Sequence, residues 1–299
     1  MKNEQSSPMV RMMRWLITNP KVFTGVAIIG FFFLMGLLGP LFVHGDPNAL
    51  DPNSSLLPPS PQHWLGTTQT GQDVFAQMII GSRVSLLLGF GAGFLATVLS
   101  VVIGLLAGYF GGIVDDMLSL LINIFLVLPA LPLAVVLTTY FPVRGSTPVA
   151  IVILVTGWAW GARVLRSQTL SLRKREFVEA ARMIGDNPWR IVFAEILPNE
   201  IAIVASSFVG TVIYAILADV GLEFLGLGDV TGVSWGNMFF WAQNNDALIQ
   251  GAWWWFVAPG ACVALLGAGL SLVNFGIDEL ANPRLRNEGR LLKKRKAVA

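Results

Sequence analysis

The chain has 299 residues, of which 54% are hydrophobic and only 13% are charged. Soluble domains carry about 25% charged residues, so one water-soluble globule could not bury this much apolar surface. The composition therefore excludes a soluble enzyme, a coiled coil and a disordered tail. The single cysteine, Cys262, also excludes an intrachain disulfide and a thiolate metal cluster.

Six uncharged runs are long enough, or nearly so, to cross a bilayer as helices, because a spanning helix needs about 20 residues. They cover residues 22–43, 84–110, 117–143, 145–162, 201–218 and 247–277. Several stretches within them are apolar on every side, which disfavours an outer-membrane barrel, whose strands alternate apolar and polar residues. The sequence predicts an all-α, polytopic membrane protein with about six transmembrane helices.

The runs divide the chain into segments. We expect an N-terminal segment at 1–21, a first transmembrane helix at 22–43, an extracytoplasmic loop at 44–83, a core of five helices at 84–277 and a basic tail at 278–299. The core includes a cytoplasmic loop at 163–200. The first run has 22 uncharged residues, more than the roughly 7–15 of a signal peptide, so we interpret it as a retained helix.

The distribution of basic residues predicts the orientation. Eighteen of the 20 Lys and Arg lie before the first run, between the fourth and fifth, or after the sixth. Short loops rich in Lys and Arg stay in the cytoplasm, so both termini are predicted to be cytoplasmic, in a multi-pass protein of the cell (inner or cytoplasmic) membrane. Asp219, Glu223 and Asp229 are assigned to an outer loop, and the six runs contain no ionisable residue.

The segment between the fourth and fifth runs has a helical pattern. Apolar residues occur at i, i+3, i+4 and i+7, namely Phe177, Ala180, Ala181 and Ile184. This spacing predicts a short amphipathic helix. Gly185 suits its end, Asn187 and Pro188 suit the start of a second helix, and Pro198 is expected to end that helix. A stiff connector lying on the bilayer explains the pattern equally well, whereas a DNA-binding hairpin is disfavoured because membrane spans flank both its ends.

Three motifs carry a family resemblance. Glu179-Ala180-Ala181, Gly185 and Ile196-Leu197-Pro198-Asn199 resemble the EAA motif of permease subunits of ABC importers. His63-Trp64-Leu65-Gly66 and Leu222-Glu223-Phe224-Leu225-Gly226 resemble the dipeptide, oligopeptide and nickel branch of these permeases. The resemblance extends over residues 20–286 and is to the second permease of such systems. It implies the type I ABC importer permease fold with a cytoplasmic coupling helix.

The resemblance implies that the hairpin docks on a cytoplasmic ATPase. The coupling residues would be Glu176, Phe177, Glu179, Ala180, Ala181, Ile184 and Gly185. The implied partners are a second homologous permease, two ATPase subunits, an extracytoplasmic solute-binding protein and membrane lipid. The chain contains no Gly-x-x-x-x-Gly-Lys-[Ser/Thr] loop, so ATP and Mg²⁺ are expected on the partner ATPases, with no cofactor, metal or catalytic residue in this chain.

The cargo implied by the resemblance is a peptide, with oligosaccharides or nickel as alternatives. The chain departs from the family pattern where Thr68 and Gln72 replace an expected Asp and Arg, and where Asn123 replaces an expected membrane Asp. An expected proline-bearing turn is replaced by a segment that begins at Asp229. These departures leave the choice among cargoes open.

Small residues and prolines mark the membrane helices. Gly89, Gly93, Gly104 and Gly108 predict a close helix interface, either within the subunit or with the second permease. Pro129 and Pro132 should break the third helix near Asn123. We interpret this break as part of a pathway or gate. The alternative is a simple kink, with Asn123 in an interhelical hydrogen bond. Trp253, Trp254 and Trp255 are interpreted as an aromatic belt at the outer interface, with peptide or sugar stacking as the alternative.

Other classes of protein have weaker support. A secondary transporter or channel needs ionisable residues inside the membrane, and the six runs have none. An intramembrane protease would need a second carboxylate near Asp229 of the Gly226-Leu227-Gly228-Asp229 pattern. Neither His44 nor His63 belongs to a zinc-binding motif, and no nucleic-acid partner is expected.

Overall fold

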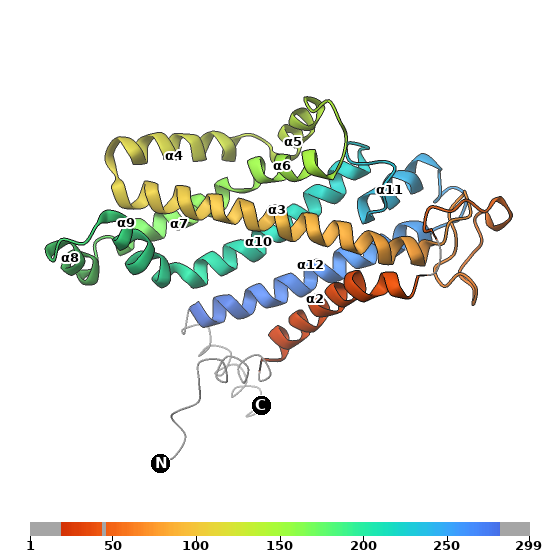
Figure 1. The fold of residues 1–299 in the computed structure, drawn as a ribbon, viewed down its shortest axis with the longest axis horizontal. Helices are drawn as coiled ribbons and strands as arrows, with labels where there is room; N and C mark the ends of the chain where they lie inside the picture. Colours follow the sequence, from red (N-terminus) through yellow and green to blue (C-terminus); the bar gives the residue numbers. More distant parts are fainter. Residues whose placement is uncertain (1–18, 44–45, 282–299) are drawn as a thin grey trace, which may run out of the picture.

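The computed structural model describes residues 19–43 and 46–281 (Figure 1), so predictions for residues 1–18 and for most of the tail at 278–299 fall outside it. The regular elements of the described ranges are helices, and the long ones lie roughly along one axis. We call the end that carries residues 173–190 the hairpin end. The opposite end, formed by residues 46–73 and 225–253, is the loop end.

The helices follow the predicted all-α architecture. In chain order they are α2 (Pro20–Leu38), η1 (Gly39–Leu41), η2 (Pro52–Ser54), α3 (Val74–Phe110), α4 (Gly112–Val127), α5 (Ala130–Thr139), α6 (Ser146–Gly157), α7 (Ala159–Leu172), α8 (Glu176–Met183), α9 (Pro188–Arg190), η3 (Ile191–Ile196), α10 (Leu197–Phe224), α11 (Trp235–Asn244) and α12 (Trp254–Ala281). Five continuous segments of the described residues are long and apolar enough to cross a membrane, or six if α4 and α5 together form one broken span. The predicted count of about six agrees with this range.

Helix α3 is the centre of the bundle, and it packs against α2, α4, α6, α7 and α10. Its 37 residues would extend about 55 Å at 1.5 Å per residue, more than the bilayer core requires. It begins ten residues before the predicted run, because the Asp73 carboxylate accepts a hydrogen bond from the backbone N–H of Ala76 at 2.8 Å and caps the helix. Arg83 therefore lies within a helix, and the predicted loop at 44–83 is too long.

The third run is broken as predicted, with a bend of 92° between α4 and α5. Leu128 has an extended backbone, and Pro129 is the N-cap of α5. Pro132 lies in the first turn of α5, where a backbone N–H would have no helical partner. Pro132 therefore belongs to the start of the new helix and does not itself break one.

The prediction that Pro198 ends a helix is wrong. The chain stays helical from Pro188 to Phe224, and Pro198 is near the start of α10. The preceding turns, η3, form a π-helix in which the backbone N–H of Leu197 donates to the carbonyl of Val192. The wider π-helical turn accommodates a proline that lacks an N–H donor and would crowd the carbonyl of an ordinary preceding turn. The cytoplasmic loop predicted at 163–200, in which two short helices were expected, also begins inside a longer helix, since α7 continues to Leu172.

Helix α10 also continues further than predicted at its other end. It includes Asp219 and Glu223, which are 0% and 3% exposed, and its first turn contains Glu200, which is 0% exposed. The assignment of Asp219 and Glu223 to an outer loop is therefore wrong. The fifth run, drawn at 201–218, is shorter than the helix, which carries ionisable residues on both sides of that run. The helix ends where Gly226 adopts a positive φ of 73°.

The main core lies between α2, α3, α10, α11 and α12. Phe32, Trp235 and Leu266 are among its fully buried side chains. Trp254 and Trp255 belong to the same core and are 8% and 2% exposed, whereas Trp253 is 54% exposed. The interpretation of these tryptophans as an interfacial belt is therefore wrong for Trp254 and Trp255, because both pack inside the protein.

Candidate functional site

The hairpin end consists of two short helices joined by a tight turn. Gly185 has a φ of 83° and follows α8, and the backbone N–H of Asp186 donates to the carbonyl of Ala181. This backbone pattern closes a helix at a glycine. Asn187 accepts a hydrogen bond from the backbone N–H of Trp189 at 2.9 Å, with Pro188 at the first helical position. The structure confirms the predicted end and restart of the helices at these residues.

Helix α8 contacts the bundle partly through the face that the sequence predicted for a partner. Val178 and Ala181 are buried, and they pack in a cluster with Leu105 and Tyr109 of α3. Ala181 is therefore not available to a partner, although the sequence placed it on the contact face. The sequence pattern did not predict that Val178 is buried. The only indication of this was its spacing of i, i+3 from Ala181.

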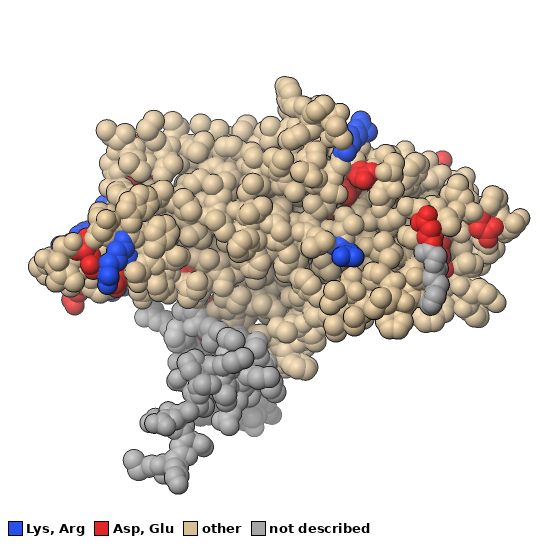
Figure 2. All heavy atoms as spheres, in the orientation of Figure 1, with Lys and Arg blue, Asp and Glu red and all other residues tan. Residues whose placement is uncertain are grey.

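The opposite face of α8 is open. Ala180, Glu176 and Glu179 are exposed, while Phe177 and Ile184 are 36% and 79% exposed. Charged side chains visible in Figure 2 gather mainly at the two ends of the molecule, including this one. Helix α8 thus presents apolar side chains bordered by charged ones at the tip of the bundle.

Polar contacts attach the hairpin to the long helices. The Arg173 guanidinium donates to the carbonyls of Gly108 and Tyr109 at 3.2 and 3.4 Å, and the Arg182 guanidinium lies 5.1 Å from the centre of the Tyr109 ring. At the base of the hairpin, the Thr169 hydroxyl donates to the buried Glu200 carboxylate at 2.8 Å. These contacts join the hairpin end to α3 and join α7 to α10 at its base.

Helix α7 holds α4 through two arginines. Arg166 makes a two-pronged ion pair with Asp115, with 2.8 Å between one of its terminal nitrogens and the carboxylate. Arg163 donates to the side-chain oxygen of Asn123 at 2.6 Å. Asn123, a candidate for the pathway or gate, thus forms an exposed interhelical hydrogen bond one turn or more before the bend at Pro129.

The four glycines of α3 lie against helices of the same chain. A Cβ atom on Gly89 or Gly93 would come within 2.8 Å of Ile216 or Val212 of α10. A Cβ atom on Gly104 or Gly108 would come within 2.8 Å of α7. The structure thus uses all four glycines for packing within the subunit.

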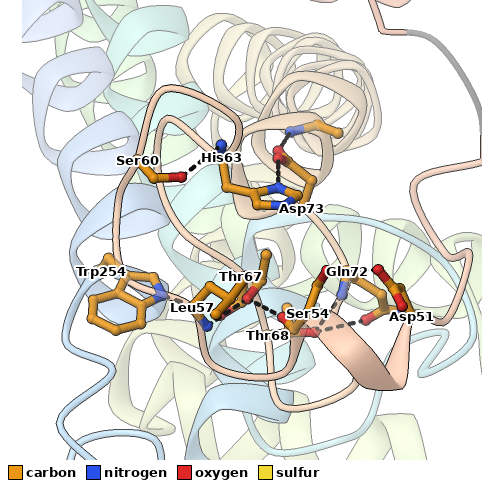
Figure 3. A network of polar contacts seen from close by, with 11 residues as sticks. Asp51, Ser54, Leu57, Ser60, His63, Thr67, Thr68, Gln72, Asp73 and Trp254 are labelled. Carbon is orange, nitrogen blue, oxygen red and sulfur yellow. Dashed lines mark hydrogen bonds and ion pairs between the residues drawn. The ribbon is translucent and has the colours of Figure 1, made fainter.

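The loop end is ordered by a network of polar contacts (Figure 3). The Thr67 hydroxyl donates to the carbonyl of Ser54 at 2.5 Å, and its backbone carbonyl accepts from the Trp254 indole at 3.1 Å. Nδ1 of His63 lies 2.8 Å from the Asp73 carboxylate. Donation by the Ser54 hydroxyl and by the backbone N–H of Asn53 holds the pKa of Asp51 below its usual value. These contacts fix the loop on the start of α12.

Thr68 and Gln72, two of the departures from the family pattern, interact with each other. The backbone N–H of Gln72 donates to the Thr68 hydroxyl at 3.1 Å. Gln72 also lines a cavity of about 580 Å³ at the loop end, together with Thr231, Asn237, Trp241 and other uncharged residues. The described lining of this cavity has no charged side chain.

Asp219 and Glu223 stand one helical turn apart, and the sequence analysis missed their burial. The Ser234 hydroxyl donates to the Glu223 carboxylate, and Ser234 is the N-cap of α11. Neither carboxylate oxygen of Asp219 has a hydrogen-bond partner among the described residues. The sequence feature that could have predicted this burial is the i, i+4 spacing of the two acids beside an apolar run.

Comparison with known proteins identifies the family. Residues 100–287 match the model of the family described as "Binding-protein-dependent transport system inner membrane component". The chain is 32% identical to the dipeptide transport system permease protein DppC of Bacillus subtilis over 91% of this chain and 85% of that protein. It is 30% identical to the oligopeptide transport system permease protein OppC of the same species, over 90% of this chain and 87% of that protein.

A further relative is the probable D,D-dipeptide transport system permease protein DdpC of Escherichia coli. It is 32% identical over 90% of each chain. These relatives are matched along nearly their whole length, and the all-helical bundle has several apolar helices of spanning length. The chain therefore belongs to the family of inner membrane components of binding-protein-dependent transport systems, as a multi-pass permease subunit.

Proposed function

We propose that this chain is one permease half of an ATP-driven peptide importer and that α8 is its coupling helix. The observation that carries the proposal is the two-sided geometry of α8. Val178 and Ala181 secure the helix to the bundle, while Phe177, Ala180 and Ile184 remain free to enter a groove on another protein. An amphipathic helix with one apolar side left open suits helix-in-groove recognition.

The proposed partner at this surface is a cytoplasmic ATPase subunit, which would bind ATP and Mg²⁺. When two ATPases close on nucleotide, α8 would follow, and the contacts of Arg173 and Arg182 with α3 would carry the movement into the membrane helices. Nucleotide can shift the bundle only if the docked states differ in free energy. The bend between α4 and α5 and the pairing of Arg163 with Asn123 lie on helices that such a movement would shift.

Peptides are the proposed cargo. The support comes from the relatives, which are named as dipeptide and oligopeptide permeases and are 32% and 30% identical over 91% and 90% of this chain. The chain would pair with a second homologous permease, and a solute-binding protein would deliver the peptide at the loop end. Both termini and the hairpin end would then face the cytoplasm.

The double variant Glu179→Lys plus Ala180→Arg tests the role of α8. Both side chains are exposed, so the variant should fold and insert, but it places two positive charges where the partner groove must approach. We expect peptide uptake and ATPase co-purification to be lost in membranes that contain normal amounts of the chain.

A matched control is Ser171→Arg, which adds a positive charge at an exposed position of the same end but outside α8. This control should retain uptake and ATPase binding. Normal uptake by the double variant would contradict the assignment of α8 as the coupling helix. Loss of uptake with ATPase still bound would place the defect in transmission of the movement and not in docking.

A further inference from the structure

An apolar groove runs along the outside of the bundle where α2, α12 and the loop end meet. Its open cavity has a volume of about 410 Å³. Helix α2 contributes Phe31, Phe32 and Met35, and helix α12 contributes Val257, Ala261 and Leu265. Every residue that lines it is apolar or aromatic, so the groove offers no partner to a charged ligand.

The groove is continuous with the lipid-facing surface of the protein. Helices α2 and α12 pack side by side (Figure 1), and both are long and apolar enough to cross the bilayer. Phe31, Val257 and Leu265 are each more than half exposed. An apolar surface of this kind at membrane depth contacts hydrocarbon unless another protein covers it.

The length of the groove matches one leaflet. Trp254 and Leu265 are eleven residues apart on α12, or about 16 Å at 1.5 Å per residue. Half of the ~30 Å hydrocarbon core is about 15 Å. At the loop end of the groove, Trp64 and Trp253 are 66% and 54% exposed. Exposed tryptophans favour the level of the lipid headgroups, so the groove extends from headgroup level to near the bilayer midplane.

The size of the groove decides between two occupants. A helix with its side chains is about 10–12 Å wide, so a 16 Å length of one fills well over 1,000 Å³ and could place only part of its volume in this open groove of about 410 Å³. A single extended hydrocarbon chain is narrow enough to lie between α2 and α12. We propose that the groove is a specific binding site for one acyl chain of a membrane lipid whose headgroup lies beside Trp64 and Trp253.

A bound acyl chain would stabilise the attachment of the loop end. Trp254 lines the groove with one part of its ring and donates its indole N–H to Thr67, which organises the loop (Figure 3). Van der Waals attraction depends on close partners for the atoms that line the groove. A lipid tail would supply such partners and hold α2, α12 and the loop together.

The test uses a phospholipid with a photoactivatable diazirine in its acyl chain. The full permease complex is reconstituted with this lipid, washed with an excess of unlabelled lipid and irradiated, and the labelled residues are mapped by mass spectrometry. We expect label on the groove segments of α2 and α12 to persist after the wash. Label should be several-fold weaker at Leu95 of α3, an exposed apolar position outside the groove.

Two alanines of α12 provide matched variants. Ala261 lines the groove, whereas Ala264 is also exposed but does not line it. Ala261→Phe should reduce groove labelling several-fold, and Ala264→Phe should leave it unchanged. Val257→Trp, at a second exposed lining position, should reproduce the loss if Ala261→Phe fails to fold. The proposal would be overturned if the Ala261 and Ala264 variants were labelled equally, or if the groove were labelled no more strongly than Leu95. Coverage of the groove by another protein chain would also overturn it.

Discussion

At the scale of single residues, carboxylates occur in two contrasting settings. Asp229 follows the end of α10, where the Thr231 hydroxyl and the backbone N–H groups of Thr231 and Gly232 donate to it, and these donors lower its pKa. Asp219 is buried within α10 and has no partner among the described residues. The first carboxylate should stabilise its surroundings, and the second should not.

The Asp229 setting predicts a pH dependence. Its folded-state pKa is below its ordinary value of about 3.9, so the carboxylate stabilises the folded chain above about pH 4, and this contribution is lost as the pH falls through the folded pKa. Asp229→Asn should therefore lower the melting temperature at pH 7, and the difference from the parent should shrink as the pH falls below about 4. Tryptophan fluorescence during heating in detergent measures the melting temperatures of the variant and the parent. An equal difference at pH 7 and pH 3 would contradict the prediction.

The buried pair in α10 predicts two opposite responses. Glu223 accepts from Ser234 at the N-terminus of α11, so Glu223→Gln should destabilise the chain by about 0.5–1.5 kcal/mol, the range for a typical hydrogen bond. Asp219→Asn should leave stability unchanged or raise it, because an unpartnered buried carboxyl group contributes no hydrogen bond that the amide could lose. Denaturant titration of both purified variants is the measurement. A greater loss in Asp219→Asn than in Glu223→Gln would show that Asp219 has a partner.

At the scale of helices, hydropathy predicted which segments are helical but not where they begin and end. Arg83 and Asp219 interrupted uncharged runs, yet both lie inside helices whose ends are determined by Asp73 and Gly226. A cap or a positive-φ glycine is a local signal, whereas the burial of Asp219 depends on packing between helices far apart in sequence. The prediction that Pro198 ends a helix failed for a related reason, since the π-helical turn that accommodates this proline has no sequence signature of its own.

The glycines of α3 offer a test of helix packing. Gly104→Ala would place a Cβ atom 2.8 Å from the backbone carbonyl of Ala162 in α7, and overpacking of this kind costs about 1–3 kcal/mol. Gly91 is on the same helix, and a Cβ atom there meets nothing within 4 Å. Gly91→Ala should be neutral or stabilising, because alanine favours a helix over glycine by up to about 1 kcal/mol. Equal unfolding free energies for the two variants would show that α3 and α7 separate at little cost.

At the scale of the whole molecule, the periodicity of residues 176–184 predicted α8 but not its orientation on the bundle. Phe177, Ala180 and Ala181 all fit one helical stripe, yet burial separates Ala181 from the other two. The side that packs inward is chosen by Tyr109 and Leu105 on α3, about 70 residues earlier in the chain. Local spacing therefore predicts that a surface exists, while the tertiary contacts decide which residues remain for a partner.

The central claim is that the hairpin end docks on an ATPase. The most direct measurement places a photo-crosslinking amino acid at Ile184, which is 79% exposed at the hairpin end, or at Ile249, which is 86% exposed at the loop end. The tagged chain is irradiated in native membranes, and the captured proteins are identified by mass spectrometry. We predict that Ile184 captures a protein with a Gly-x-x-x-x-Gly-Lys-[Ser/Thr] loop and that Ile249 does not. Capture of lipid alone at Ile184, or of the same ATPase at both positions, would contradict this account.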